Sequence, residues 1–118
     1  MPIEGREMRK PNKVNRVVQP KEFTELSLPR AIPVVYLVDQ CKGRAYIGKG
    51  FVTVPQWAEE RGRDYFLWYI AHELSHILSC SHLHDFTFYK MFLQICPESL
   101  QHHELHYKPS AIGFGIKV

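Results

Sequence analysis

Short apolar runs alternate with polar turns across the middle of the chain, from residue 32 to residue 55. The run IPVVYLVD at 32–39 is β-branched and aromatic, which predicts a buried strand. A turn around Gly43 leads to a second short strand, AYIG at 45–48, and a glycine-rich turn leads to a third, FVTVP at 51–55. Because the turns are short, we expect these three strands to form an antiparallel meander.

The apolar spacing then changes to that of a helix. Apolar residues at alternating intervals of three and four predict a core-facing stripe on a helix from about Tyr65 to Ser79, with Asp64 as its N-cap; the stripe comprises Leu67, Ile70, Leu74, Ile77 and Leu78. Aromatic residues occupy much of the remaining helix surface, so we expect His72, Glu73 and His76 not to lie on open surface. A second helix is predicted at 85–96, beginning near Asp85 and stopped by Pro97. This order predicts an α+β fold, a small antiparallel three-stranded sheet packed on the two helices.

The N-terminal segment is polar, basic and interrupted by prolines. Over residues 1–21, six basic side chains oppose two acidic ones, whereas the whole chain has a net charge of +3. We expect residues 1–20 to be a flexible basic arm that could contact DNA, and residues 21–118 to form a single domain. Within that domain, PKEFTELSL at 20–28 predicts a short helix that begins at Pro20.

Composition limits the class of protein. A length of 118 residues corresponds to one domain, and a hydrophobic content of 45% favours a globular fold. We expect no membrane segment and no secretory signal, because no long apolar run occurs and the N-terminus lacks an apolar core. Three cysteines without a C-x-x-C pair are typical of a reducing compartment, so we expect a cytoplasmic protein. Separately, we expect a monomer.

The stretch AHELSHILSCSHLHDFTF at 71–88 carries the candidate chemistry. His72 and His76 are four residues apart, so on a helix they lie on one face and can bind one ion. Glu73 lies about 100° around the helix from His72, where it can face a water molecule instead of the metal. This H-E-x-x-H pattern predicts a zinc site with Glu73 as the general base.

A catalytic zinc ion takes three protein ligands and keeps one open position. Spacing alone leaves several residues open as the third ligand beside His72 and His76. The candidates are His84, His82, Cys80, and a glutamate from a later helix, Glu98 or Glu104.

HELSH followed by HDFTF resembles the SprT-like and WLM zinc metallopeptidases, the group that includes Spartan. The resemblance covers about residues 32–96 and is specific over 71–88. It implies a zincin-like fold, zinc ligands at His72, His76 and His84, Glu73 as the catalytic base, Asp85 as the acidic residue after the third ligand and Phe88 as a core aromatic. A shorter-loop form of the family pattern fits His82 and Phe86 on spacing, so His82 is the alternative third ligand.

The resemblance implies a zinc-dependent endopeptidase that acts on a protein or peptide substrate. We expect the strand 51–55 to be a sheet edge along which an extended substrate adds as a further strand. The alternative is a zinc-binding module without proteolytic activity that binds DNA or a protein partner. In such a module a fourth protein ligand would close the site.

Overall fold

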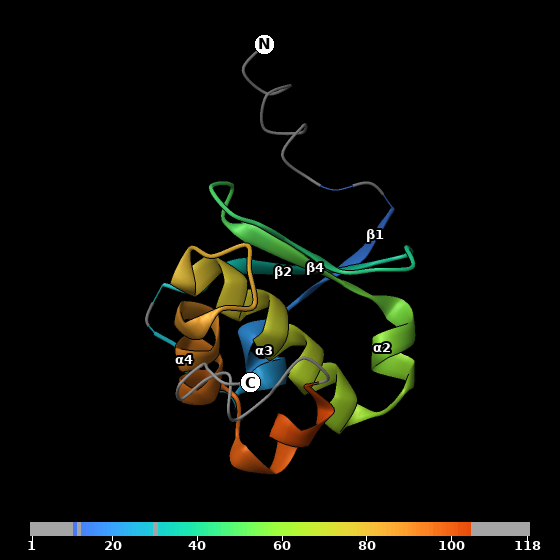
Figure 1. The fold of residues 1–118 in the computed structure, drawn as a ribbon. Helices are drawn as coiled ribbons and strands as arrows, with labels where there is room; N and C mark the ends of the chain where they lie inside the picture. The colour runs from blue at the N-terminus through green and yellow to red at the C-terminus, as the bar shows by residue number, and fades with distance from the viewer. Residues whose placement is uncertain (1–10, 12, 30, 105–118) are drawn as a thin grey trace.

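The computed structural model describes residues 11, 13–29 and 31–104, and it has an α+β architecture as expected (Figure 1). Its four-stranded sheet comprises β1 (Val14–Val18), β2 (Val34–Val38), β3 (Arg44–Tyr46) and β4 (Phe51–Pro55). The helices are the 3-10 helix η1 (Pro20–Phe23), α2 (Gln56–Glu60), α3 (Arg63–Ser79), α4 (Phe86–Ile95) and the 3-10 helix η2 (Glu98–His103). In Figure 1 the helices α2, α3 and α4 lie on one side of the sheet.

The sheet is mixed, so the predicted three-stranded antiparallel meander is wrong. The strand order is β1-β2-β4-β3, in which β2 pairs antiparallel with β1 and parallel with β4. Only the hairpin between β3 and β4 is antiparallel in the expected way. All five residues of β4 are buried, and a strand without a solvent-facing side is most stable between two neighbours.

This order also corrects the expected substrate edge. β4 is paired on both sides and has no free edge, whereas β3 pairs with β4 on one side only among the described strands. The short and half-exposed β3 is therefore the sheet edge next to the helices.

The strand β1 corrects the expected extent of the N-terminal arm. We predicted an arm up to residue 20, but Val14–Val18 pair with β2 and the Val18 side chain is buried in the core. Arg16 forms ion pairs with Glu22 at 2.9 Å and with Glu59 at 2.6 Å, which tie this strand to η1 and α2. Residues 1–10 and 12 of the predicted arm lie outside the described part of the chain.

The helix α3 runs through the centre of the domain. It begins at Arg63 with Gly62 as N-cap, so the predicted N-cap at Asp64 is wrong by two residues. Gly62 has φ of 120°, a conformation that glycine adopts without strain. Leu67, Ile70 and Leu74 of the predicted stripe are buried against the sheet and α4, as expected. No helix among the described residues has the length and apolarity needed to cross a membrane.

Candidate metal centre

α3 presents His72 and His76 on consecutive turns of one face. Both side chains come from the middle of a 17-residue helix whose surface is largely covered. His72 and His76 are each 8% exposed, and Glu73 is 7% exposed, which confirms that these three residues are not on open surface. Buried imidazole and carboxylate groups are costly without partners, so the contacts around them define the site.

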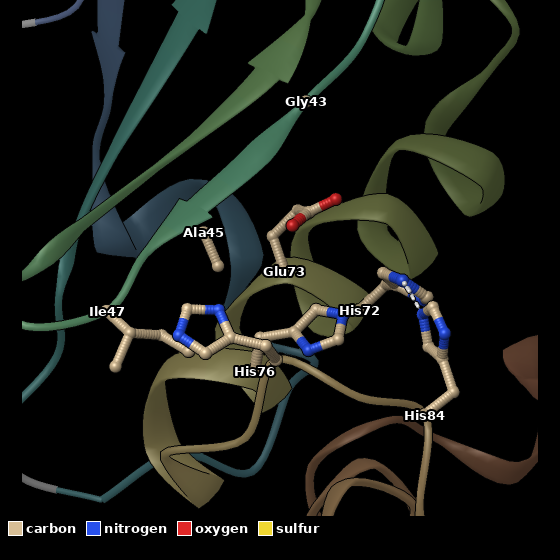
Figure 2. Close-up of a pocket in the computed structure, with 8 residues that line it drawn as sticks. Gly43, Ala45, Ile47, His72, Glu73, His76 and His84 are labelled. Carbon is tan, nitrogen blue, oxygen red and sulfur yellow. Dashed lines mark hydrogen bonds between the residues drawn. The ribbon is translucent and has the colours of Figure 1, made fainter.

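His84 reaches the same place from the loop between α3 and α4. One ligand nitrogen from each of His72, His76 and His84 can be chosen so that all three atoms lie within 4.8 Å of one another. The Nε2 atoms of His84 and His72 are 3.2 Å apart, a contact marked by the dashed line in Figure 2. Two nitrogens bound to one tetrahedral zinc ion at the usual bond length lie about 3.3 Å apart, so this spacing fits a shared metal ion.

The Nδ1 atoms of His72 and His76 each contact an oxygen that can accept a hydrogen bond. His72 Nδ1 lies 2.6 Å from an oxygen of Glu104, whose side chain is fully buried. His76 Nδ1 lies 2.7 Å from the carbonyl oxygen of Ser81. Because both acceptors face Nδ1, the hydrogen belongs on that atom, and the Nε2 lone pair is left for a metal ion.

The remaining third-ligand candidates do not belong to the group of three histidines. His82 lines the same cavity but does not belong to the group of three histidines. Cys80 is exposed at the C-cap of α3, and Glu98 is exposed at the start of η2. Glu104 contacts the far side of His72, so it acts on a ligand and is not placed as a ligand itself.

Glu73 lies outside the group of three histidines but lines the same cavity, which has a volume of about 240 Å³. Figure 2 shows its carboxylate directed toward the strand that carries Gly43 and Ala45. Burial raises the pKa of Glu73 to about 7, against the lowering effect of the neighbouring His72. A carboxylate with this pKa is matched to proton transfer near neutral pH.

Phe88 and Asp85 hold the segment HDFTF in place beside the histidines. Phe88 is fully buried, and its ring centroid lies 5.1, 4.4 and 5.0 Å from those of His72, His76 and His84. The Asp85 side chain accepts a hydrogen bond from the Phe88 amide and caps α4. The loop therefore delivers His84 at a fixed position, one residue before the cap.

Gly43 brings the edge strand close to α3. Its N–H donates to the Tyr69 hydroxyl at 2.9 Å. A Cβ atom on this residue would lie 2.4 Å from the Thr53 carbonyl oxygen and 2.7 Å from a ring carbon of Tyr69. Only glycine fits this approach, which places β3 along the cavity that Glu73 and the histidines line.

Sequence reasoning missed the partners behind the histidines. Glu104 accepts a hydrogen bond from Trp68 Nε1 at 2.9 Å as well as contacting His72, although it lies more than 30 residues from either along the chain. The tail beyond Pro97 has no periodicity that would place a side chain. The one sequence signal was that Glu104 follows two histidines. This did not show whether Glu104 would bind a metal ion itself or contact a histidine that does.

Comparison with known proteins gives no family assignment. No protein-family model, curated protein or solved structure matches the chain. What the chain can do is therefore argued from the centre itself.

Proposed function

We propose that the protein is a zinc-dependent endopeptidase with a zincin-like fold, related to the SprT-like metallopeptidases. The observation that carries this proposal is the shared cavity of Glu73 and the three histidines, with Glu73 outside the ligand group. Three histidines and an open position are typical of catalytic zinc, whereas a structural zinc ion has four protein ligands. Among the described residues, the group contains His72, His76 and His84 and no fourth protein ligand.

The residues around the centre have separate roles in the proposed peptide hydrolysis. Zinc held by the three histidines would supply a Lewis acid that polarises the scissile carbonyl and acidifies water. Glu73 accepts the proton of the attacking water and then donates it to the leaving amine. Glu104 and the Ser81 carbonyl keep His72 and His76 in the tautomer that binds metal.

An extended substrate is expected to add to the edge strand β3. The alternate residues Gly43, Ala45 and Ile47 line the cavity, so this edge runs beside the histidines. Backbone hydrogen bonds to a free strand edge hold a peptide in an extended form without requiring a particular sequence. The scissile bond would then lie over Glu73.

Replacement of Glu73 by Gln tests the proposal. Glu73→Gln should keep the fold and one zinc ion per chain but lower peptide hydrolysis roughly 100- to 10,000-fold, because the amide cannot accept the proton. The measurement is cleavage of an unfolded protein such as casein, with and without DNA and with and without a chelator, alongside a metal count per chain. Glu98→Gln, an exposed glutamate on η2, is the matched control and should cleave like the parent.

The outcomes separate the two candidate functions. Equal cleavage by the parent and Glu73→Gln would remove Glu73 as general base. A zinc ion bound by four protein ligands, together with no cleavage by the parent, would favour the alternative of a non-proteolytic zinc module. Cleavage measured in the presence of DNA tests whether nucleic acid contributes to the activity. This measurement is needed because most of the basic N-terminal segment lies outside the described residues.

A further inference from the structure

A second cavity adjoins the candidate metal centre at the N-terminal half of α3. It has a volume of about 340 Å³ and shares Gly43, His72 and Glu73 with the first cavity. Four aromatic side chains and one lysine complete its lining: Trp57, Tyr65, Trp68, Tyr69 and Lys42. The cavity is therefore continuous with the place where a substrate would be cut.

The four aromatic rings form one connected cluster. The Tyr65 centroid lies 6.0 Å from that of Trp57, 5.0 Å from that of Trp68 and 6.3 Å from that of Tyr69. The planes of Trp57 and Tyr69 are inclined by 81°, an edge-to-face arrangement. Rings held at such angles offer both faces and edges to a further ring.

Internal hydrogen bonds occupy most of the polar groups of this cluster. Trp57 Nε1 donates to the Cys41 carbonyl at 2.9 Å, and Trp68 Nε1 donates to Glu104 at 2.9 Å. The Tyr69 hydroxyl accepts the Gly43 N–H. The cavity therefore offers mainly aromatic surface, which favours a side chain that is apolar and flat.

One cation, Lys42, lines the cavity, and another, Arg61, lies against two of its aromatic rings. The Arg61 guanidinium lies 5.0 Å from the Trp57 ring centroid and 4.7 Å from that of Tyr65. Lys42 is the one basic side chain among the described lining residues, and Glu73, at the end shared with the metal centre, is the one carboxylate among them. A lysine or arginine side chain would meet the positive charge of Lys42, and Arg61 already occupies a cation-binding position on two of the rings. A neutral aromatic side chain therefore fits better.

The direction of β3 determines which part of a bound peptide would reach the aromatic cavity. β3 begins just after Gly43, at the aromatic end, and runs toward Ile47 at the far end of the first cavity. A peptide antiparallel to β3, the slightly more stable pairing, passes the metal centre first and reaches the aromatic cavity with its C-terminal half. We propose that this cavity binds an aromatic side chain of the substrate on the C-terminal side of the scissile bond.

This inference rests on the proposed peptidase function, so it is tested by two separate measurements. In the first, the parent digests a mixed peptide library, and kcat/KM is then measured for peptides that differ only in the residue after the cut. Phe should exceed Ala roughly tenfold or more, from burial of the ring, and Lys should not replace it. Trp57→Ala should reduce the Phe-to-Ala ratio to roughly threefold or less, as expected from the loss of ring contacts.

Tyr36→Ala is the matched control, because this half-buried tyrosine on β2 contacts Phe51 and lines neither cavity. It should leave the Phe-to-Ala ratio unchanged. A cooperative thermal transition and one zinc ion per chain are required of both variants. A parent that cleaves without aromatic preference, or a Trp57→Ala chain that keeps the preference, overturns the proposal.

The second measurement does not need hydrolysis. Zinc-loaded Glu73→Gln is titrated with acetyl-Ala-Ala-Phe-Ala-Ala-amide and with the Ala and Lys versions of the same peptide, and the Gly43 amide is followed by NMR. The Phe peptide should bind most tightly and shift this amide, and Trp57→Ala in the same background should abolish its advantage. If the parent fails to cleave but the Phe peptide binds in this way, the peptidase function fails and the aromatic site stands. If the three peptides bind alike, or the Lys peptide binds best, the aromatic site fails whatever the peptidase result.

Discussion

The two histidines of α3 differ in the acceptor that faces their Nδ1 atoms. His76 contacts a neutral carbonyl, whereas His72 contacts the carboxylate of Glu104, which is fully buried and also accepts from Trp68. A carboxylate fixes the tautomer and raises the basicity of a ligand imidazole more strongly than a carbonyl does. Glu104 is therefore the residue outside the ligand group that should matter most for metal affinity.

Replacing Glu104 by Gln tests whether the charge of this side chain supports metal binding. The amide can still accept from Trp68 and His72, but it carries no charge, so zinc affinity should fall roughly 10- to 100-fold. Competition with a chelating dye measures the zinc Kd, and the exposed Glu98→Gln is the control. An unchanged Kd for Glu104→Gln would show that the charge of Glu104 does not support His72.

At the scale of elements, the α3–α4 loop is fixed at both ends. Cys80 takes the left-handed conformation with φ of 54° and ends α3, and the Ser81 N–H donates to the His76 carbonyl. At the other end, the Ser81 hydroxyl contacts Asp85 at 3.1 Å, and Asp85 caps α4. His84 lies between these anchors, so its position depends on the cap.

Asp85→Ala removes that cap. The free energy of unfolding of the metal-free chain should fall by about 0.5–2 kcal/mol, as for other N-caps, and zinc should bind more weakly because His84 is less constrained. Asp85→Asn should restore most of both quantities, since its amide oxygen can accept from the Phe88 N–H. Urea unfolding and zinc competition give the two values. Parent-like stability and affinity in Asp85→Ala would contradict a role for the cap.

At the scale of the whole molecule, the N-terminal strand is tied to the rest of the domain by charge as well as by the sheet. Arg16 pairs with Glu22 on η1 and Glu59 on α2. Burial acts to raise the pKa of Glu22, but hydrogen bonds from the Gln19 amide and the Arg16 guanidinium outweigh it and lower the pKa below 4.5. A depressed pKa adds stability above the unfolded value, and this contribution is lost as the pH falls through the folded value.

Arg16→Gln should therefore destabilise the chain in a pH-dependent way. At pH 7 we expect a loss of about 0.5–1 kcal/mol in the free energy of unfolding, because these side chains are partly exposed and solvent screens them. The difference from the parent should shrink as the pH falls from 4.5 through the lower pKa that Glu22 has in the folded chain. Urea unfolding between pH 3 and pH 7 checks this, with exposed Lys49→Gln as control. A difference that does not depend on pH would point to packing by Arg16 instead.

The sequence by itself determined the local features of this protein. The 3-4 spacing predicted α3 and its buried face, FVTVP predicted β4, and Asp85 marked the start of α4, because these features depend on neighbours within a few residues. The spacing of His72 and His76 likewise places them on one helix face, with Glu73 about 100° around the helix from His72. The sequence could predict their chemistry because all three residues lie within two turns of a single helix.

Only the tertiary structure decided how those elements combine. Strand order cannot be read from spacing. The pairing of β4 with both β2 and β3, and hence the position of β3 at an edge among the described strands, is seen only in the folded chain. Equal spacing also left His82 and His84 undecided, and the structure groups His84 with the helical pair. Glu104 and the aromatic cavity join residues far apart in sequence, and contacts of that kind form only when the whole chain packs.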